Sequence, residues 1–195
     1  MAYVFAVEGL SSLENIDNLP EEILLKARQA INAAADRART QAAKDIRSEL
    51  NFPARYLTDR LTVRERARGT NLQAVISGRD RPTSLARFAT STNIQASRKK
   101  GFVQVKVGKS TKRISGGFLI KLRNDNIGLA MRLKPGETVK GKRAAAKRFS
   151  SKDADLVLLY GPSIDQAFQT EVDKTKLTDD TARFLENEFI RLMGI

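Results

Sequence analysis

The sequence contains neither histidine nor cysteine, and this limits the chemistry that its side chains can perform. Histidine is the commonest general base near neutral pH and the commonest metal ligand, and cysteine supplies the thiolates of most structural zinc sites. Ser–His and Cys–His catalytic pairs and ordinary zinc sites are therefore excluded. Only carboxylate, lysine, tyrosine or hydroxyl chemistry remains.

Two segments partly match a phosphate-binding P-loop. Gly136–Lys142 has the glycine and lysine spacing of that motif, but Arg143 stands where a Ser or Thr would hold Mg²⁺. No apolar strand leads into it, because Lys134 and Pro135 come first. Gly108–Ser110 has the right ending, but Val103 occupies the position of the first glycine. Neither segment predicts a nucleotide site.

Two acidic pairs, Asp153/Asp155 and Glu186/Glu188, have the residue type for acid–base catalysis. Nothing in the sequence brings a second catalytic group to either pair, so we interpret both as solvated surface. The sequence thus predicts no catalytic residue, no cofactor-binding residue and no metal ligand, and we do not expect an enzyme.

Positive charge is concentrated in residues 98–148, which we call the basic window. It contains sixteen Lys and Arg residues against two acids, a net charge of +14, whereas the whole chain carries +13. Such a local field favours DNA, RNA or an acidic protein surface as a partner, and the alternative is a set of lysines that only face water. The candidate contact residues are Arg98, Lys99, Lys100, Lys106, Lys109, Lys112, Arg113, Lys140, Lys142, Arg143, Lys147 and Arg148.

Three phenylalanines, Phe102, Phe118 and Phe149, are interleaved with these basic residues. Base stacking on a sheet would use such residues, but their wide separation in the sequence favours positions in the core. The sequence shows no helix–turn–helix, zinc-finger or RNA-recognition signature. No apolar run approaches the ~20 residues of a membrane span, so no membrane partner is expected.

The helices and strands expected from the sequence predict an α+β fold in one domain over residues 1–195, with a mostly antiparallel sheet. The longest is a helix from Pro20 to Leu50, with acids in its first turn. Its alanine-rich stripe is Leu24, Ala27, Ile31, Ala34, Ala38, Ala42, Ile46 and Leu50. Strands are predicted at 3–10, 61–67, 71–77, 102–107, 117–122, 127–133 and 156–160. The 117–122 run is apolar on both faces, which favours the sheet interior; 84–97 and 134–147 are predicted as an irregular connection and a long exposed loop.

The C-terminal segment, residues 163–195, is acidic and helical in this interpretation. Ser163 and Gln166 have capping-box spacing for a short helix through Phe168. A final helix is expected from Thr178, with an inner face formed by Ala182, Leu185, Phe189 and Leu192. The turn before the short helix consists of Tyr160, Gly161, Pro162 and Ser163, and we expect a positive φ at Gly161.

The order of these elements resembles the minor tail protein Z family of long-tailed bacteriophages. The similarity covers nearly the whole chain: a short strand ending in Gly9-Leu10, a long Ala/Arg helix containing 34–40, then 51–55. It continues with a Gly-Gly-Phe118 strand after a basic hairpin. Its most specific part is Leu159-Tyr-Gly-Pro-Ser-Ile164.

The resemblance implies a structural virion protein at the head-proximal end of the tail, in tail completion, head–tail joining and positioning of the DNA end. It implies a ring of identical copies, with six as the expected number, assembled in the bacterial cytoplasm, with tail terminator, tail tube or neck proteins and the phage DNA end as partners. The family has no catalytic residues, and the Tyr160–Ser163 turn would be structural. The alternative is a free nucleic-acid-binding protein that uses the basic window.

Overall fold

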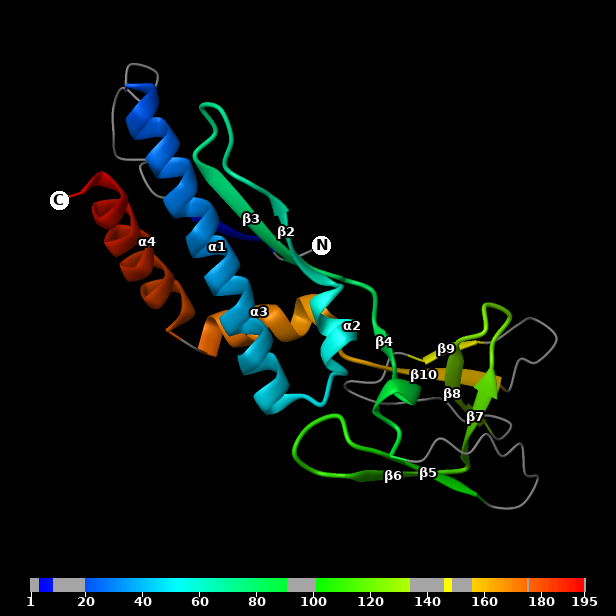
Figure 1. Cartoon of the computed structure of the whole chain (residues 1–195). Helices are drawn as coiled ribbons and strands as arrows, with labels where there is room; N and C mark the ends of the chain where they lie inside the picture. The colour runs from blue at the N-terminus through cyan, green and yellow to red at the C-terminus, as the bar shows by residue number, and fades with distance from the viewer. Residues whose placement is uncertain are drawn as a thin grey trace. The chain divides into compact units, whose positions relative to one another are not determined.

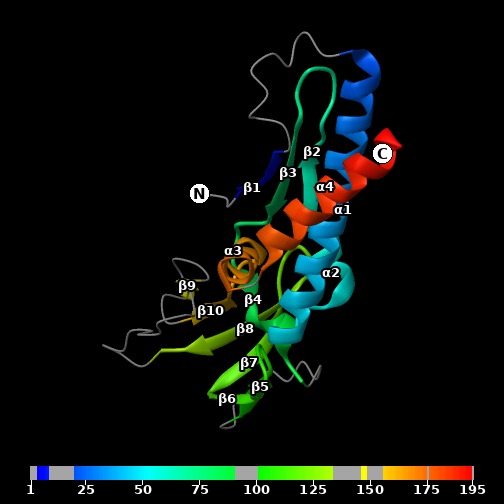
Figure 2. The same cartoon turned by 90° about the vertical axis from the view of Figure 1, so that its left-hand side faces the viewer.

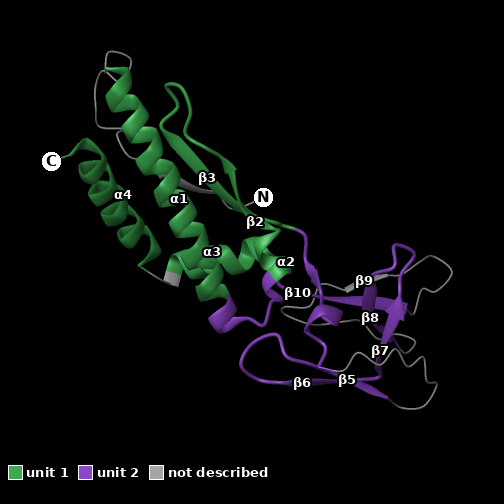
Figure 3. Ribbon diagram, in the orientation of Figure 1, with its two compact units in different colours: residues 1–46, 55–80, 164–195 green, residues 47–54, 81–163 purple. Residues whose placement is uncertain are grey.

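The computed structural model describes residues 4–8, 20–90, 101–133, 146–148, 156–174 and 176–194 of the 195-residue chain. Its fold class is α+β, as the sequence predicts (Figure 1). The chain divides into two compact units that interleave along the sequence (Figure 3). Unit 1 is Met1–Ile46, Arg55–Asp80 and Ile164–Ile195, and unit 2 is Arg47–Ala54 and Arg81–Ser163. The expectation of one domain over the whole chain stays a prediction.

Unit 1 contains four helices and a three-stranded sheet among its described residues. The helices are α1 (Glu21–Glu49, whose last turn belongs to unit 2), α2 (Ala54–Thr58), α3 (Ile164–Lys174) and α4 (Leu177–Met193). The strands are β1 (Val4–Glu8), β2 (Leu61–Glu65) and β3 (Gln73–Gly78), antiparallel in the order β1-β3-β2. The sequence predicts all of these elements except α2. Helix α3 is longer than predicted, because it continues past Phe168 to Lys174.

Helix α1 forms where predicted because its 29 residues contain neither Pro nor Gly, and Glu21 and Glu22 complement its N-terminal dipole. Seven of the eight residues of the predicted stripe are buried, and Leu50 is half-buried. Ala30 and Ala35 are buried as well. The buried surface is wider than predicted because α1 runs between the three-stranded sheet and α4 (Figures 1 and 2).

Unit 2 is mostly β-structure. Its elements are β4 (Thr83–Ser84), the 3₁₀ helix η2 (Leu85–Phe88), β5 (Phe102–Val105), β6 (Lys112–Ser115), β7 (Gly117–Lys121), β8 (Ile127–Arg132), β9 (Ala146–Arg148) and β10 (Leu156–Gly161). The main sheet has the order β4-β10-β8-β7, and β9 also pairs with β10. Strands β5 and β6 form a separate two-stranded hairpin.

Three predictions about unit 2 are corrected. Strand β7 lies at the end of the path β4-β10-β8-β7, and Phe118 and Ile120 on it are half-buried, so the 117–122 run is not sheet interior. The strand inside the sheet is β10, whose Leu156, Val157 and Leu159 are buried. The 84–97 connection begins with ordered structure, the end of β4 and η2, and 91–97 lie outside the described residues. The predicted 134–147 loop ends in β9, and its residues 134–145 lie outside the description.

The inner face predicted for the last helix is correct only in part. In α4 the buried residues are Leu177 and Thr181, while Ala182 is exposed and Leu185, Phe189 and Leu192 are half-buried. The reason is a contact with α1: the Arg37 guanidinium carbon lies 4.6 Å from the centroid of the Phe184 ring. Phe184 of α4 therefore faces Arg37 of α1.

We expect Ala34→Leu or Ala38→Leu to destabilise the protein by about 1–3 kcal/mol, because a larger side chain at a close contact forces strain. Ala34 is 0% exposed and Ala38 is 2% exposed. A denaturant melt measures the effect, with Ala33→Leu, at a half-buried position of the same helix, as the control. Two neutral variants would contradict close packing on this face.

Candidate interaction surface

The β5–β6 hairpin separates its residues between two faces. Alternation along β5 buries Val103 and Val105 and exposes Phe102, Gln104 and Lys106. The register places Phe102 opposite Ser115 and Gln104 opposite Arg113, so residues on β6 join the same exposed face. We call this the hairpin outer face. It consists of Phe102, Gln104, Lys106, Arg113 and Ser115.

Phe102 corrects the expectation that the phenylalanines of the basic window lie in the core. Its side chain is 44% exposed, and the Arg113 guanidinium carbon lies 3.6 Å from its ring centroid. This is close for a cation over an aromatic face. Phe118 is half-buried, and Phe149 lies outside the described residues. The hairpin outer face therefore combines an accessible ring with positive charge.

The loop of the hairpin is bound to the last residue of α1 and to Asn51 beyond it, all within unit 2. The Asn51 backbone N–H donates to the Val107 carbonyl oxygen at 2.8 Å, and its side-chain amide donates to the Gly108 carbonyl oxygen at 2.6 Å. Lys109 pairs with Glu49 across 3.1 Å. Sequence reasoning used Asn51 only as a helix stop and missed this role.

The structure describes only part of the predicted contact set. Lys106 and Arg113 lie on the hairpin outer face, Lys112 is exposed on β6, and Lys109 is exposed but paired with Glu49. Lys147 and Arg148 belong to β9. The predicted contact residues outside the described parts of the chain are Arg98, Lys99, Lys100, Lys140, Lys142 and Arg143.

The Tyr160–Ser163 turn joins β10 to α3 and depends on close packing rather than on a positive φ. Gly161 is a strand residue paired with Thr83, and it does not have the left-handed φ that the sequence suggested. A Cβ atom at Gly161 would lie 3.1 Å from a Leu85 methyl carbon and 3.4 Å from the Phe88 ring. Ser163 is 1% exposed and stands directly before α3, and the capping box of Ser163 and Gln166 stays a prediction.

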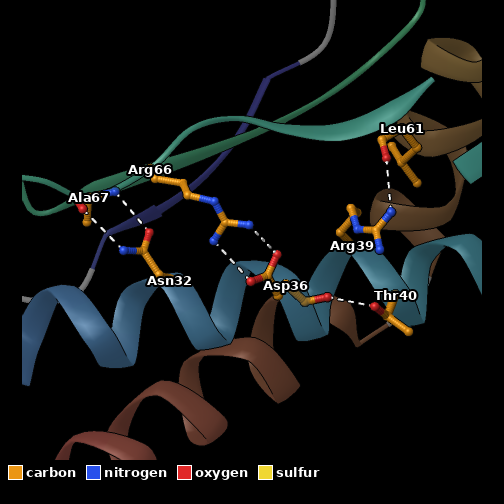
Figure 4. A network of polar contacts seen from close by, with 7 residues as sticks. All are labelled: Asn32, Asp36, Arg39, Thr40, Leu61, Arg66 and Ala67. Carbon is orange, nitrogen blue, oxygen red and sulfur yellow. Dashed lines mark hydrogen bonds and ion pairs between the residues drawn. The ribbon is translucent and has the colours of Figure 1, made fainter. Parts of the chain in front are cut away.

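Sequence reasoning missed a line of polar contacts between α1 and the β2–β3 hairpin (Figure 4). The Asn32 amide donates to the Ala67 carbonyl oxygen at 3.1 Å and accepts from the Ala67 N–H at 3.0 Å. One turn later, Asp36 accepts two hydrogen bonds from Arg66, at 2.8 and 3.0 Å, and these contacts raise the pKa of the Arg66 guanidinium.

Arg28 and Arg39 extend this line at its two ends. Arg28 donates to the Gly69 carbonyl oxygen at 2.7 Å, and Arg39 donates to that of Leu61 at 3.5 Å. The four helix residues follow one another at steps of four, four and three, beside the apolar stripe. That spacing was the sequence signal that could have indicated a second line of contacts on α1. It was not interpreted in this way because polar residues on a helix ordinarily face water.

Helix α4 also has an apolar line, which we call the α4 stripe; one of its residues is exposed and the three larger ones are half-buried. The stripe consists of Ala182, Leu185, Phe189 and Leu192. Glu188 and Arg191 form an ion pair next to it, and Arg191 lowers the pKa of the Glu188 carboxyl. None of the helices in the described part of the chain is long and apolar enough to span a membrane.

The sequence matches the family described as Prophage minor tail protein Z (GPZ) over residues 7–190. The chain is a member of this family. It is therefore a bacteriophage tail protein with a structural role, and its place is in the virion. No curated protein matches the chain, and no solved structure does.

We expect Asn32→Ala to lower the free energy of unfolding by about 1–3 kcal/mol, because the partly buried N–H and C=O of Ala67 both lose their partner. Asn32→Asp should cost less, since a carboxylate still accepts from the Ala67 N–H. Gln41→Ala, at an exposed position of α1, serves as the control for helix propensity. Equal melting curves for the Asn32 and Gln41 variants would show that the contact does not stabilise the fold.

Proposed function

We propose that this tail protein acts at the head-proximal end of the tail, where it completes the tail, joins it to the head and positions the DNA end. It does so as a ring of identical copies, with six as the expected number, beside tail terminator, tail tube or neck proteins. Family membership supports a structural tail role, and the basic window is the single observation that carries the proposal further.

The physical argument rests on unneutralised charge. A net +14 within 51 consecutive residues repels itself, so a folded protein gains stability from a negative partner. On the described β5–β8 residues, the ion pairs Lys109–Glu49 and Lys121–Asp125 leave Lys106, Lys112 and Arg113 exposed. Both the DNA end and an acidic neighbouring ring offer the required negative charge. The lysines then act together through their field.

We expect simultaneous reversal of Lys99, Lys100, Lys112 and Arg113 to Glu to leave the chain folded while tails fail to join heads or to deliver DNA. A field made by many charges tolerates one loss, so Lys109→Gln alone should leave infectivity close to normal. The measurement is plaque yield in a complementation assay, with electron microscopy of the particles.

The matched control reverses four exposed basic residues outside the window, Lys44, Arg47, Arg64 and Arg81. Thermal melts of the purified variants confirm folding. Normal plaque yield from the window variant would overturn the functional interpretation of the basic window. Equal loss in both variants would show that it depends on total charge alone.

A free nucleic-acid-binding protein is the second candidate, and the hairpin outer face is the observation that favours it. An exposed aromatic ring among cations is the arrangement on which unpaired bases stack. Phe102, with Arg113 over its ring, has that arrangement.

A salt titration separates the two candidates. For a free nucleic-acid binder, the affinity for a labelled oligonucleotide falls linearly with the logarithm of salt concentration. With 6–10 phosphate contacts, the loss is about 10³–10⁵-fold between roughly 50 and 200 mM salt. Fluorescence anisotropy measures it, and Phe102→Ala should weaken single-strand binding specifically. Without saturable binding of the purified chain, the second candidate fails.

A further inference from the structure

Strand β6 has an open edge in the described part of the chain. It pairs with β5 in a separate two-stranded sheet, and β5 is bonded on its other side as well (Figure 1). On that other side, the Thr90 N–H donates to the Gln104 carbonyl oxygen at 3.0 Å, and the Lys106 N–H donates to that of Phe88 at 2.8 Å. No described strand occupies the corresponding side of β6.

The pairing pattern shows which residues of β5 bond to β6. Neighbouring residues of an antiparallel strand direct their N–H and C=O groups to opposite sides. Because the Gln104 carbonyl oxygen is used on the far side of β5, the residues that bond to β6 are Val103 and Val105. The next bond of this ladder follows the same alternation, since the Gly116 N–H donates to the Gly101 carbonyl oxygen at 2.9 Å.

The same alternation divides the residues of β6. Ile114 and Lys112 are the register partners of the two valines, so they bond to β5. Arg113 and Ser115 direct their N–H and C=O groups the other way, to the open edge. Both residues are exposed, and neither has a backbone hydrogen bond on this edge to another residue that the structure describes. The open edge therefore offers donors and acceptors at the spacing of a β-ladder.

Positive charge surrounds the open edge. Lys112 and Arg113 are exposed on β6, and Lys106 is exposed directly after β5. None of these three cations has an ion pair with another described residue. Ile114 is half-buried on the face opposite to Arg113, so part of an apolar side chain is accessible beside the edge. An added strand would thus meet positive charge together with an apolar contact.

The backbone groups of the edge distinguish a peptide from a nucleic acid. Phosphate oxygens accept hydrogen bonds but donate none, so a nucleic acid would leave the outward carbonyl oxygens of Arg113 and Ser115 facing negative charge. An extended peptide supplies N–H and C=O groups in alternation and satisfies the donors and the acceptors together. The open edge therefore favours a polypeptide strand.

The charge of the edge restricts which strand can bind. Charged residues on an edge strand ordinarily prevent chance pairing with another strand. Pairing of β6 with the β6 of a second copy would place Lys112 and Arg113 of both copies near one another, and like charges in such positions are destabilising. An acidic strand is attracted by the same residues that repel a second β6.

We propose that β6 accepts an extended acidic segment of a neighbouring tail protein as an additional strand. The segment pairs with the open edge at Arg113 and Ser115, its carboxylates lie beside Arg113 and within reach of Lys112, and an apolar residue packs on Ile114. Main-chain hydrogen bonds supply affinity, and the cations select the partner. This inference rests on the proposed place of the protein beside other tail or neck proteins and names the chemistry of one contact. The rest of the basic window stays available for the DNA end.

Ser115→Pro tests the edge without removing a hydrogen bond between β5 and β6. Proline has no N–H and is accommodated on an edge strand where that N–H would face solvent. Ser115→Ala keeps the N–H and is the matched control, and thermal melts of the two variants should agree. The probe is a fluorescein-labelled peptide of about eight residues that alternates Glu with Val. Fluorescence anisotropy should show saturable binding to Ser115→Ala and binding weaker by about tenfold or more to Ser115→Pro.

N-methylated peptides separate strand pairing from attraction by charge. One peptide carries N-methyl groups on every Glu and a second carries them on every Val, so both keep the charge of the probe. A strand that pairs through one edge is blocked by only one of these two sets. We expect one methylated peptide to bind like the probe and the other to bind about tenfold more weakly or worse.

A charge exchange tests the selection of an acidic strand. A peptide that alternates Lys with Val should not bind the unchanged protein. Lys112→Glu with Arg113→Glu should reverse this preference, so that the variant binds the basic peptide and loses the acidic one. Thermal melts confirm that the double variant folds.

Four results in solution would overturn the inference. They are no saturable binding of the acidic probe, equal binding to Ser115→Pro and Ser115→Ala, equal binding of both N-methylated peptides, and a single-stranded DNA oligonucleotide whose binding Ser115→Pro weakens by the same factor as that of the peptide. The second and third would show attraction by charge alone, and the fourth would show a nucleic acid as the occupant of the edge.

Complementation with the same two variants separates this inference from the proposed function. We expect Ser115→Ala to support head joining and Ser115→Pro to fail. Tails that contain Ser115→Pro at the normal level and join heads normally would overturn the inference and leave the proposed function intact. Tails that join heads and deliver DNA without this protein would refute the proposed function instead.

Discussion

The alanine-rich surface of α1 is the constraint on which unit 1 depends. Ala30, Ala34, Ala35 and Ala42 are 0% exposed, so small side chains are fully covered along most of the helix. Alanine buries little area per residue, but its burial costs no side-chain entropy. A helix with larger residues at these positions would hold the sheet and α4 farther away. The polar contacts from Asn32 and Asp36 would then lose their geometry.

These polar contacts complement the alanine packing. Apolar contact between small side chains is weakly directional, whereas the two hydrogen bonds between Asn32 and Ala67 fix how the helix lies along the β2–β3 hairpin. The exposed Asp36–Arg66 pair adds little free energy, as surface ion pairs do, but its two-point geometry supports the same alignment. The alignment of α1 on the β2–β3 hairpin is thus determined by polar groups that lie beside its alanine-rich surface.

Charged residues are distributed unevenly between the two units. The basic window lies within unit 2, while α4 of unit 1 contains four acids and two bases. In a monomer this segregation is costly, but in an assembly of identical copies it becomes a source of complementary surfaces. A structural tail protein needs no active site. Contacts with itself, with neighbouring proteins and with DNA are what its residues must provide.

Sequence alone determined the features that depend on local periodicity and composition. The length of α1, the alternation of β5, the buried strand β10, the lack of histidine and cysteine, and the charge of the basic window all follow from neighbouring residues.

Tertiary structure decided which of several possible partners each surface meets. Helix α4 turns Phe184 toward Arg37 and leaves Ala182 outside, although periodicity allows either face inward. Phe102 is exposed because the alternation of β5 buries Val103 and Val105. Gly161 is required by the nearness of Leu85 and Phe88, which come from far away in the chain. Periodicity defines the faces of an element, but only the packed neighbours determine which face is covered.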